Sequence, residues 1–283
     1  AWLLTLPLAI SFYTFHQISF LVDVSRGKVK RPDILTYTTY ILLFPQLIAG
    51  PIVRYSEIGG QLRRRMPIFV EHRLFRIGFI FLILGLAKKV LIADSLAPFV
   101  DFGFSHVSEL SIIQAWQAVL GFTFQIYFDF SGYTDMAIGM ALMMGLRFPR
   151  NFNSPYHASN ITDFWKRWHM TLSRFLRDYL YKPLGGNRLG FERTLLNLMI
   201  VMLLGGLWHG ANWTFVIWGG LHGAYLVSHR LWSRFTLVRM PAIIAWAITF
   251  ISVVIAWIFF RASNVDDAFE MFRHLTPYSP IKS

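Results

Sequence analysis

The segment Leu195-Leu-Asn-Leu-Met-Ile-Val-Met-Leu-Leu-Gly-Gly-Leu-Trp-His-Gly-Ala-Asn-Trp213 places a histidine, His209, inside a nearly continuous apolar run. A run of this length can cross a bilayer as a helix, and an ionisable side chain is costly to bury there. A histidine in such a run therefore usually serves a buried site or a polar pathway. Because imidazole titrates near neutral pH, it can take up a proton and return it. For this residue alone, a core histidine hydrogen-bonded to a carbonyl group is the alternative.

The composition extends the membrane interpretation to the whole chain. Of its 283 residues, 55% are hydrophobic and 15% are charged, whereas about a quarter of the residues of soluble domains are charged. This length leaves room for about six to eight spans. No polar stretch suggests a separate soluble domain, so we expect one membrane-embedded domain over residues 1–283 in an all-α polytopic protein. The chain begins within an apolar run without Met, and we expect an internal fragment with both ends missing.

Charge and cysteine content restrict the chemistry. The net charge is +12, but the basic residues lie between apolar runs, where they orient spans and attract anionic lipid head groups. We therefore expect membrane lipids as partners and no nucleic acid. The absence of cysteine excludes an acyl-cysteine intermediate within this sequence. His222 and His229 are seven positions apart, too far for the usual i,i+4 metal pair, so we expect no metal site.

The apolar runs give the order of the predicted spans. Pro45 interrupts the second run and favours a broken or re-entrant segment. Lys88 and Lys89 either end the third span or snorkel from it. Asp129 and Asp135 precede or enter a short apolar segment that suits a buried or re-entrant helix. The predicted segments are Trp2–Val22, Ile34–Val53, Leu74–Ala87 with Val90–Val100, Ile112–Phe130, Tyr133–Leu146, Leu195–Gly210, Trp213–Ser228 and Ile243–Phe260, followed by an amphipathic helix at Val265–Leu275.

The stretch between Arg147 and Arg193 is polar, basic and therefore expected to be cytoplasmic. Within it, Asn160 followed by Asp163 has the form of a helix start. Apolar residues recurring at spacings of three and four predict one amphipathic helix from there to the turn at Pro183, lying at the membrane interface. The predicted i,i+4 ion pairs are Asp163–Arg167 and Arg174–Asp178. This helix presents His169 next to Trp168, although an ordinary interfacial anchor explains the apolar stripe equally well.

Several strings carry a resemblance to a known family. They are Phe44-Pro-Gln-Leu-Ile-Ala-Gly-Pro-Ile-Val-Arg-Tyr-Ser-Glu57, Phe128-Asp-Phe-Ser-Gly-Tyr-Thr-Asp-Met-Ala-Ile-Gly139, Asn151-Phe-Asn-Ser-Pro-Tyr156 through Tyr179-Leu-Tyr-Lys-Pro-Leu-Gly-Gly186, and Gly206-Leu-Trp-His-Gly210. In these strings the chain resembles the membrane-bound O-acyltransferases, in particular the branch that contains the alginate O-acetyltransferase membrane subunit.

The resemblance implies a fold and an activity. The fold is a ring of transmembrane helices, with re-entrant and interfacial helices around a central funnel, in the bacterial inner membrane. The implied reaction moves an acetyl group from a cytoplasmic thioester, acetyl-coenzyme A, toward hydroxyls of an exported polysaccharide such as alginate, directly or through exported-side partner proteins. No tightly bound cofactor is implied. The family's signature histidine falls on His209 and its second histidine on His169.

The residues then suggest a division of roles. His209 is the expected general base, and His169 would position the thioester, help to polarise it, or be structural. Asn160, Asp163 and Trp208 are candidates for shaping the tunnel. Arg177 is a candidate for holding the phosphates of the donor, although positive-inside placement explains the same charge. The alternative functions are D-alanyl or other acyl transfer to a cell-wall polymer, and a proton-coupled transporter.

Overall fold

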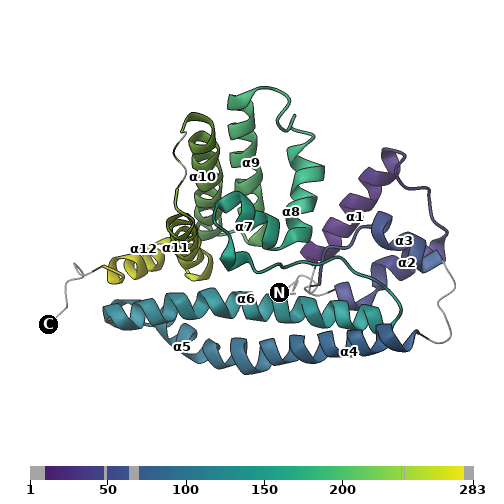
Figure 1. The fold of residues 1–283 in the computed structure, drawn as a ribbon, viewed down its shortest axis with the longest axis horizontal. Coiled ribbons are helices and arrows are strands. Elements are labelled where there is room, and N and C mark those ends of the chain that lie inside the picture. The colour runs from purple at the N-terminus through teal and green to yellow at the C-terminus, as the bar shows by residue number, and fades with distance from the viewer. Residues whose placement is uncertain (1–9, 48–49, 64–69, 237, 239, 277–283) are drawn as a thin grey trace, which may run out of the picture. The chain divides into compact units, whose positions relative to one another are not determined.

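The structure, a computed structural model, describes residues 10–47, 50–63, 70–236, 238 and 240–276 (Figure 1). Helices and turns account for all regular structure in these ranges, which confirms the all-α prediction. By length and composition, two of the described helices are apolar enough to cross a membrane, α9 (Phe191–His209) and α11 (Ala242–Arg261). The chain divides into two compact units, which are described separately.

The first unit comprises residues 1–89, 129–152 and 169–175. Its helices are α1 (Ile10–Ser25), α2 (Ile34–Leu42), α3 (Tyr55–Arg63), α4 (His72–Ala87), the second half of α6 (Ile112–Met143) and most of α8 (Met170–Leu176). Tyr40, Val53 and Ile58 are fully buried in its core, and the Tyr40 hydroxyl donates to the Val53 carbonyl at 3.0 Å. This bond joins α2 to the loop before α3.

The predicted break in the Ile34–Val53 run is confirmed. Helix α2 ends at Leu42, and a 3₁₀ turn that contains Pro45 follows at Phe44–Gln46. Proline favours this ending because it lacks the N–H group that would continue the helix. Residues 48–49 of this run, and residues 2–9 of the first predicted span, lie outside the described residues.

The paired lysines do not end the third predicted span, because helical structure continues through them. A π-helical stretch, Lys88–Ala93, connects α4 to α5 (Asp94–Ser105). Lys88 and Lys89 form ion pairs with Asp135 at 2.5 Å and Asp129 at 2.7 Å. Each lysine thus meets a carboxylate of α6, which lowers the cost of placing its charge among apolar residues.

Helix α6 contradicts the prediction of two separate segments at Ile112–Phe130 and Tyr133–Leu146. It is one helix of 32 residues, Ile112–Met143, or about 48 Å long. Gly132 does not break it because its missing side chain serves packing: a Cβ there would lie 2.7 Å from the Gly85 carbonyl oxygen of α4. The glycine marks a close helix–helix approach, not a boundary.

The second unit comprises residues 90–128, 153–168 and 176–283. It contains α5, the first half of α6, α7 (Ile161–Arg167), α9, α10 (Trp213–Phe235), α11 and α12 (Val265–His274). Helix α12 is the amphipathic helix predicted at Val265–Leu275, with Phe269 and Phe272 exposed. Helices α9 and α10 run side by side (Figure 1) and make the most extensive helix–helix contact within this unit.

The single amphipathic helix predicted from Asn160 to Pro183 is wrong. Helix α7 ends at Arg167, Trp168 is extended, and His169 has a left-handed φ of 40° before α8 begins. The Met170 N–H donates to the Asn151 carbonyl at 2.8 Å instead of to a helical partner. A tertiary bond therefore replaces the helical one at the point where periodicity predicted continuity.

Candidate active site

His209 is the last residue of α9. Its ring is half-buried and lies 4.7 Å from the Trp208 ring, 5.1 Å from Trp218 and 5.0 Å from Phe260, measured between centroids. Within the described ranges, no residue forms a hydrogen bond with the His209 ring. Aromatic packing positions this imidazole and leaves both of its nitrogens available for proton transfer.

The glycines next to His209 permit this packing. A Cβ at Gly206 would lie 2.2 Å from the Phe215 carbonyl oxygen, and a Cβ at Gly210 would lie 2.6 Å from the Phe215 ring. The Phe215 ring lies 6.2 Å from that of His209. Glycine thus lets the start of α10 approach the end of α9 closely enough to enclose the histidine.

A second histidine, His222, contacts this aromatic group through Trp218 and was not predicted as a site residue. It is fully buried, and its Nδ1 accepts a hydrogen bond from the indole N–H of Trp165 at 3.3 Å. The Trp218 ring lies 4.8 Å from His222 and 5.1 Å from His209. One feature of the sequence could have indicated this contact. Trp165 and His222 each place a ring nitrogen on an apolar helix face, where a buried polar atom needs a hydrogen-bond partner.

Asn160 and Asp163, both predicted to shape a tunnel, have local structural roles. The Asn160 side chain caps α7 by accepting a hydrogen bond from the Asp163 N–H at 2.8 Å, as the sequence predicted. The Asp163 carboxylate pairs with Arg167 at 2.8 Å, which confirms the predicted i,i+4 pair. A role in donor binding stays a prediction for both residues.

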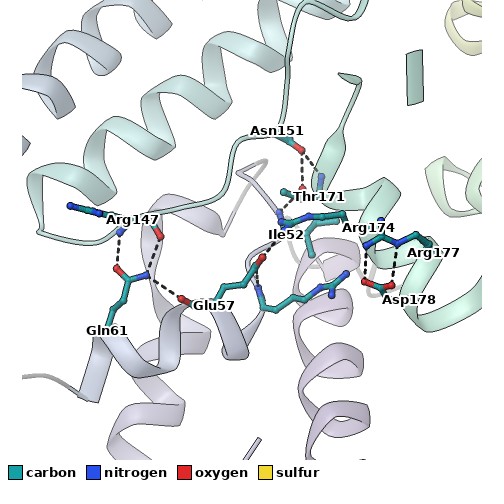
Figure 2. Close-up of polar contacts among 10 residues, drawn as sticks. Ile52, Glu57, Gln61, Arg147, Asn151, Thr171, Arg174, Arg177 and Asp178 are labelled. Atoms are coloured by element: carbon teal, nitrogen blue, oxygen red, sulfur yellow. Dashed lines mark hydrogen bonds and ion pairs between the residues drawn. The ribbon is translucent and has the colours of Figure 1, made fainter. Parts of the chain in front are cut away.

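The predicted pair between Arg174 and Asp178 is wrong. Arg174 pairs with Glu57 of α3 at 2.7 Å, which ties α8 to α3 within the first unit (Figure 2). Asp178 accepts from its neighbour Arg177 at 3.1 Å and from Lys182 at 2.7 Å. The break before α8 explains the change, because it turns the Arg174 side chain toward α3.

The other two candidates differ in their surroundings. Trp208 lies directly against His209, as a residue that shapes the site would. Arg177 is an exposed side chain whose guanidinium already pairs with Asp178 (Figure 2). Binding of donor phosphates by Arg177 therefore stays a prediction.

The loop before α7 is anchored by Tyr156. Its hydroxyl donates to the Thr123 carbonyl at 2.6 Å, and its own carbonyl accepts from the Trp246 indole at 2.8 Å. Burial raises the pKa of the Tyr156 phenol well above its usual value. The phenol therefore remains a proton donor and keeps the loop bonded to α6.

His169 lies in the first unit and has a polar environment. It is buried with 2% of its surface exposed, and its Nδ1 lies 3.1 Å from the Asn151 side-chain oxygen. The Phe130 ring meets it edge-on at 4.7 Å. Its left-handed backbone costs a non-glycine residue about 1–2 kcal/mol, and strain of this kind concentrates at functional sites.

Asn151 was not predicted as a site residue. Its side-chain oxygen also accepts from the Thr171 N–H at 3.1 Å and from the Thr171 hydroxyl at 2.8 Å (Figure 2). The Thr171 hydroxyl in turn accepts from the Ile52 N–H at 2.9 Å. Asn151 opens one of the family-like strings, but nothing in its local spacing shows that it contacts His169.

Comparison with known proteins places the chain. Residues 2–265 match the membrane-bound O-acyltransferase family. The chain is 46% identical to a peptidoglycan O-acetyltransferase of Helicobacter pylori, with 95% of this chain and 56% of that protein covered. It is 46% identical to a protein named "Probable alginate O-acetylase AlgI" in Pseudomonas aeruginosa, with 94% and 51% covered.

A more distant relative is the teichoic acid D-alanyltransferase of Bacillus subtilis, 27% identical over 86% of this chain and 65% of that protein. The chain spans about half the length of the acetyl-transfer relatives it matches. The family match covers nearly the whole chain, including the break between α7 and α8 that holds His169 and the helix α9 that ends at His209. The chain therefore belongs to the membrane-bound O-acyltransferase family.

Proposed function

We propose that the complete protein transfers an acetyl group from a cytoplasmic thioester, acetyl-coenzyme A, toward hydroxyls of an exported polysaccharide. The observation that carries the proposal is the similarity of nearly the whole chain to relatives named for O-acetyl transfer. In this proposal the chain is part of one acyltransferase domain, a ring of membrane helices around a funnel, in the bacterial inner membrane. Exported-side acetylation proteins are the proposed partners.

His209 is the proposed general base. Its neutral imidazole takes the proton of an acceptor hydroxyl, and the oxygen attacks the thioester carbonyl carbon. The C–S bond then breaks, and the imidazolium returns its proton to the leaving thiolate. General base catalysis of this kind contributes about 100- to 10,000-fold in rate. The half-buried position of the ring among aromatic side chains supports the role, because it limits water while leaving an approach open.

His169 is proposed to position the reactants, either the thioester donor or the acceptor hydroxyl that attacks it. Its burial and its bond to Asn151 support a fixed orientation, which catalytic groups require. Trp208 is the proposed wall of the acyl site beside His209, because its indole ring lies next to that imidazole.

The acceptor has two candidates, each suggested by a named relative. A glycan of the cell wall follows from the peptidoglycan O-acetyltransferase, and an exported polymer follows from the alginate acetylase. D-alanyl transfer is the second candidate reaction, favoured only by the 27% identical relative. Both reactions use the same attack on a thioester, so His209 would serve each of them.

The test expresses the complete gene product in its own organism, with His209→Ala and His209→Gln compared to wild type at equal membrane abundance. The measured quantities are ester-linked acetyl on exported polysaccharide, acetyl on cell-wall glycan, and ester-linked D-alanine. We expect one of the two acetyl signals to fall by at least about 100-fold in both variants. The polymer that loses acetyl identifies the acceptor.

His157→Gln is the matched control, because His157 is an exposed histidine on the loop before α7. It should leave every signal unchanged. Loss of D-alanine alone would replace acetyl transfer with aminoacyl transfer. Full retention of all three signals in both His209 variants would contradict the acyltransfer role of His209.

A further inference from the structure

The hydrogen bonds around Asn151 determine which atoms carry protons. A backbone N–H can only donate, so the Asn151 atom that faces the Thr171 N–H at 3.1 Å is the amide oxygen. The Thr171 hydroxyl accepts from the Ile52 N–H at 2.9 Å, so its own hydrogen is directed at Asn151, 2.8 Å away. Figure 2 shows this chain of bonds from Ile52 through Thr171 to Asn151.

The same oxygen lies 3.1 Å from Nδ1 of His169. An amide oxygen has no hydrogen to give, so Nδ1 of His169 must be the donor. Burial of the ring disfavours its charged form, and a neutral imidazole that carries its N–H on Nδ1 has its lone pair on Nε2. Asn151 and His169 are buried, with 1% and 2% of their surfaces exposed, and Phe130 meets the imidazole edge-on. Burial and the ring contact oppose a flip of the ring, and the bond to Asn151 opposes transfer of the proton from Nδ1 to Nε2.

We propose that Asn151 is a positioning residue that holds His169 as a neutral hydrogen-bond acceptor through Nε2. This proposal rests on the proposed acyltransfer and narrows what His169 does in it. A neutral acceptor cannot polarise the thioester carbonyl, because polarisation requires a donated hydrogen. His169 instead accepts a hydrogen from an O–H or N–H group, either the acceptor hydroxyl or an amide of the pantetheine arm of the donor.

Other charged and titratable side chains lie on the elements of the first unit that surround His169. The variants described below leave all of them unchanged. Those of α8 and α3 include the Arg174–Glu57 pair at 2.7 Å, and those of α6 pair with the lysines that follow α4. The described charged and histidine side chains of α1, α3, the second half of α6, α8 and the loops at 50–54 and 144–152 are His16, Asp23, Arg54, Glu57, Arg63, Asp129, Asp135, Arg147, Arg150 and Arg174.

The first experiment reads the tautomer directly. The complete protein is labelled with ¹⁵N-histidine in detergent, and the His169 signals are identified by their loss in His169→Gln. We expect the Nδ1–H tautomer in wild type and a mixture in Asn151→Ala. An Nε2–H tautomer in wild type, or an unchanged spectrum in Asn151→Ala, overturns the proposal. This readout does not depend on which acyl group or acceptor the protein uses, so it separates the proposal from the function above.

The second experiment uses Asn151→Asp, which keeps an oxygen opposite each donor and adds a negative charge. The carboxylate favours the imidazolium, so the pKa of His169 rises and the neutral form requires a higher pH. With acetyl-coenzyme A as donor, the acid limb of kcat/KM should move up by about one pH unit or more. Activity should recover above that limb. Asn153→Asp adds the same charge two positions away at an exposed site and should leave the limb in place.

Asn151→Ala should lower kcat by about 10- to 100-fold at every pH, the range found when the partner that orients a metal-bound histidine is removed. An unmoved acid limb in Asn151→Asp, with full activity in Asn151→Ala, overturns the positioning role even where one variant folds poorly. His169→Gln separates the two hydrogen sources. A higher KM for acetyl-coenzyme A alone assigns the pantetheine amide, a higher KM for the acceptor alone assigns the hydroxyl, and no change in either contradicts the proposal.

Discussion

The two histidines that the sequence singled out are held in opposite ways. His169 is fixed by a polar network in which the Asn151 oxygen receives three hydrogen bonds. His209 is surrounded by aromatic rings, and no described residue hydrogen-bonds to its imidazole. A hydrogen bond fixes both the orientation and the tautomer of an imidazole, whereas ring packing fixes its position and leaves the tautomer open.

This difference separates two kinds of histidine within one chain. A group that must gain and lose a proton in each turnover benefits from an environment that favours neither nitrogen. A group that must present one fixed lone pair benefits from a partner that removes the choice. The contrast also predicts that stability and activity respond differently when each histidine is replaced.

The largest expected effect is a difference between His209→Gln and His169→Gln. The first should lose activity with little loss of stability, and the second should lose more stability. His209→Gln should reduce acyl transfer by at least about 100-fold while costing only about 0.5–1.5 kcal/mol of unfolding free energy through lost aromatic contacts. His169→Gln should cost about 1–3 kcal/mol, because it leaves buried donors and acceptors unmatched. Thermal unfolding in detergent and acyl transfer at equal membrane abundance are the measurements. Equal destabilisation by both substitutions would contradict the distinction.

The sequence predicted one of these environments better than the other. The apolar run around His209 and its glycines gave a helix with a histidine at its end, and α9 has that form. Around His169 the periodicity of three and four predicted one long helix, but the Met170 N–H bonds to Asn151, which lies nineteen positions earlier in the chain. Local periodicity reports which face is buried and cannot report a distant bond that ends a helix.

The same limit explains the other errors of the sequence analysis. A break was expected in α6 between Phe130 and Tyr133, and the lysines after α4 were expected either to end a span or to snorkel from it. The structure pairs Gly132 with Gly85, and Lys88 with Asp135, across two helices. Glycine disfavours a helix interior and a charge is costly in an apolar run, but contacts that no short window contains accommodate both here. The cap at Asn160 depends only on its own turn and was predicted correctly.

The next effect concerns the aromatic enclosure of His209. Gly219→Ala should destabilise the protein by about 1–3 kcal/mol, because its Cβ would lie 2.4 Å from the Met202 carbonyl oxygen. The matched control is Gly220→Ala, whose Cβ would meet the Leu203 side chain at an ordinary 3.7 Å. It should be neutral or slightly stabilising, because alanine favours helix over glycine. Thermal unfolding checks both, and equal effects would show that α9 and α10 can separate without cost.

A smaller effect tests whether Asn160 is more than a helix cap. Asn160→Ala should cost about 1 kcal/mol through loss of the bond to the Asp163 N–H, which is 2.8 Å long. Asn160→Ser keeps a capping oxygen and should restore most of that stability. Activity should follow stability in both variants. Loss of activity in Asn160→Ser at wild-type stability would show that the amide contacts substrate, and α7 would then join the site.

The smallest expected effect compares two ion pairs, one in each unit. Asp163→Asn removes the partner of Arg167, a partly exposed i,i+4 pair at 2.8 Å, and should cost no more than about 0.5 kcal/mol. Glu57→Gln removes the partner of Arg174, and Glu57 also accepts from the Arg54 N–H at 3.0 Å. It should cost more, about 1 kcal/mol, because a helix-to-helix link and a turn are lost together.

Thermal unfolding measures these stability differences, and acyl transfer separates stability from function. If Asp163 only supports α7, Asp163→Asn keeps wild-type acyl transfer. A fall in transfer without a fall in stability would instead show that its carboxylate contacts the donor or the acceptor. Polar groups of the second unit would then take part in acyl transfer. The aromatic surroundings would describe the His209 imidazole itself and not the whole site in that unit.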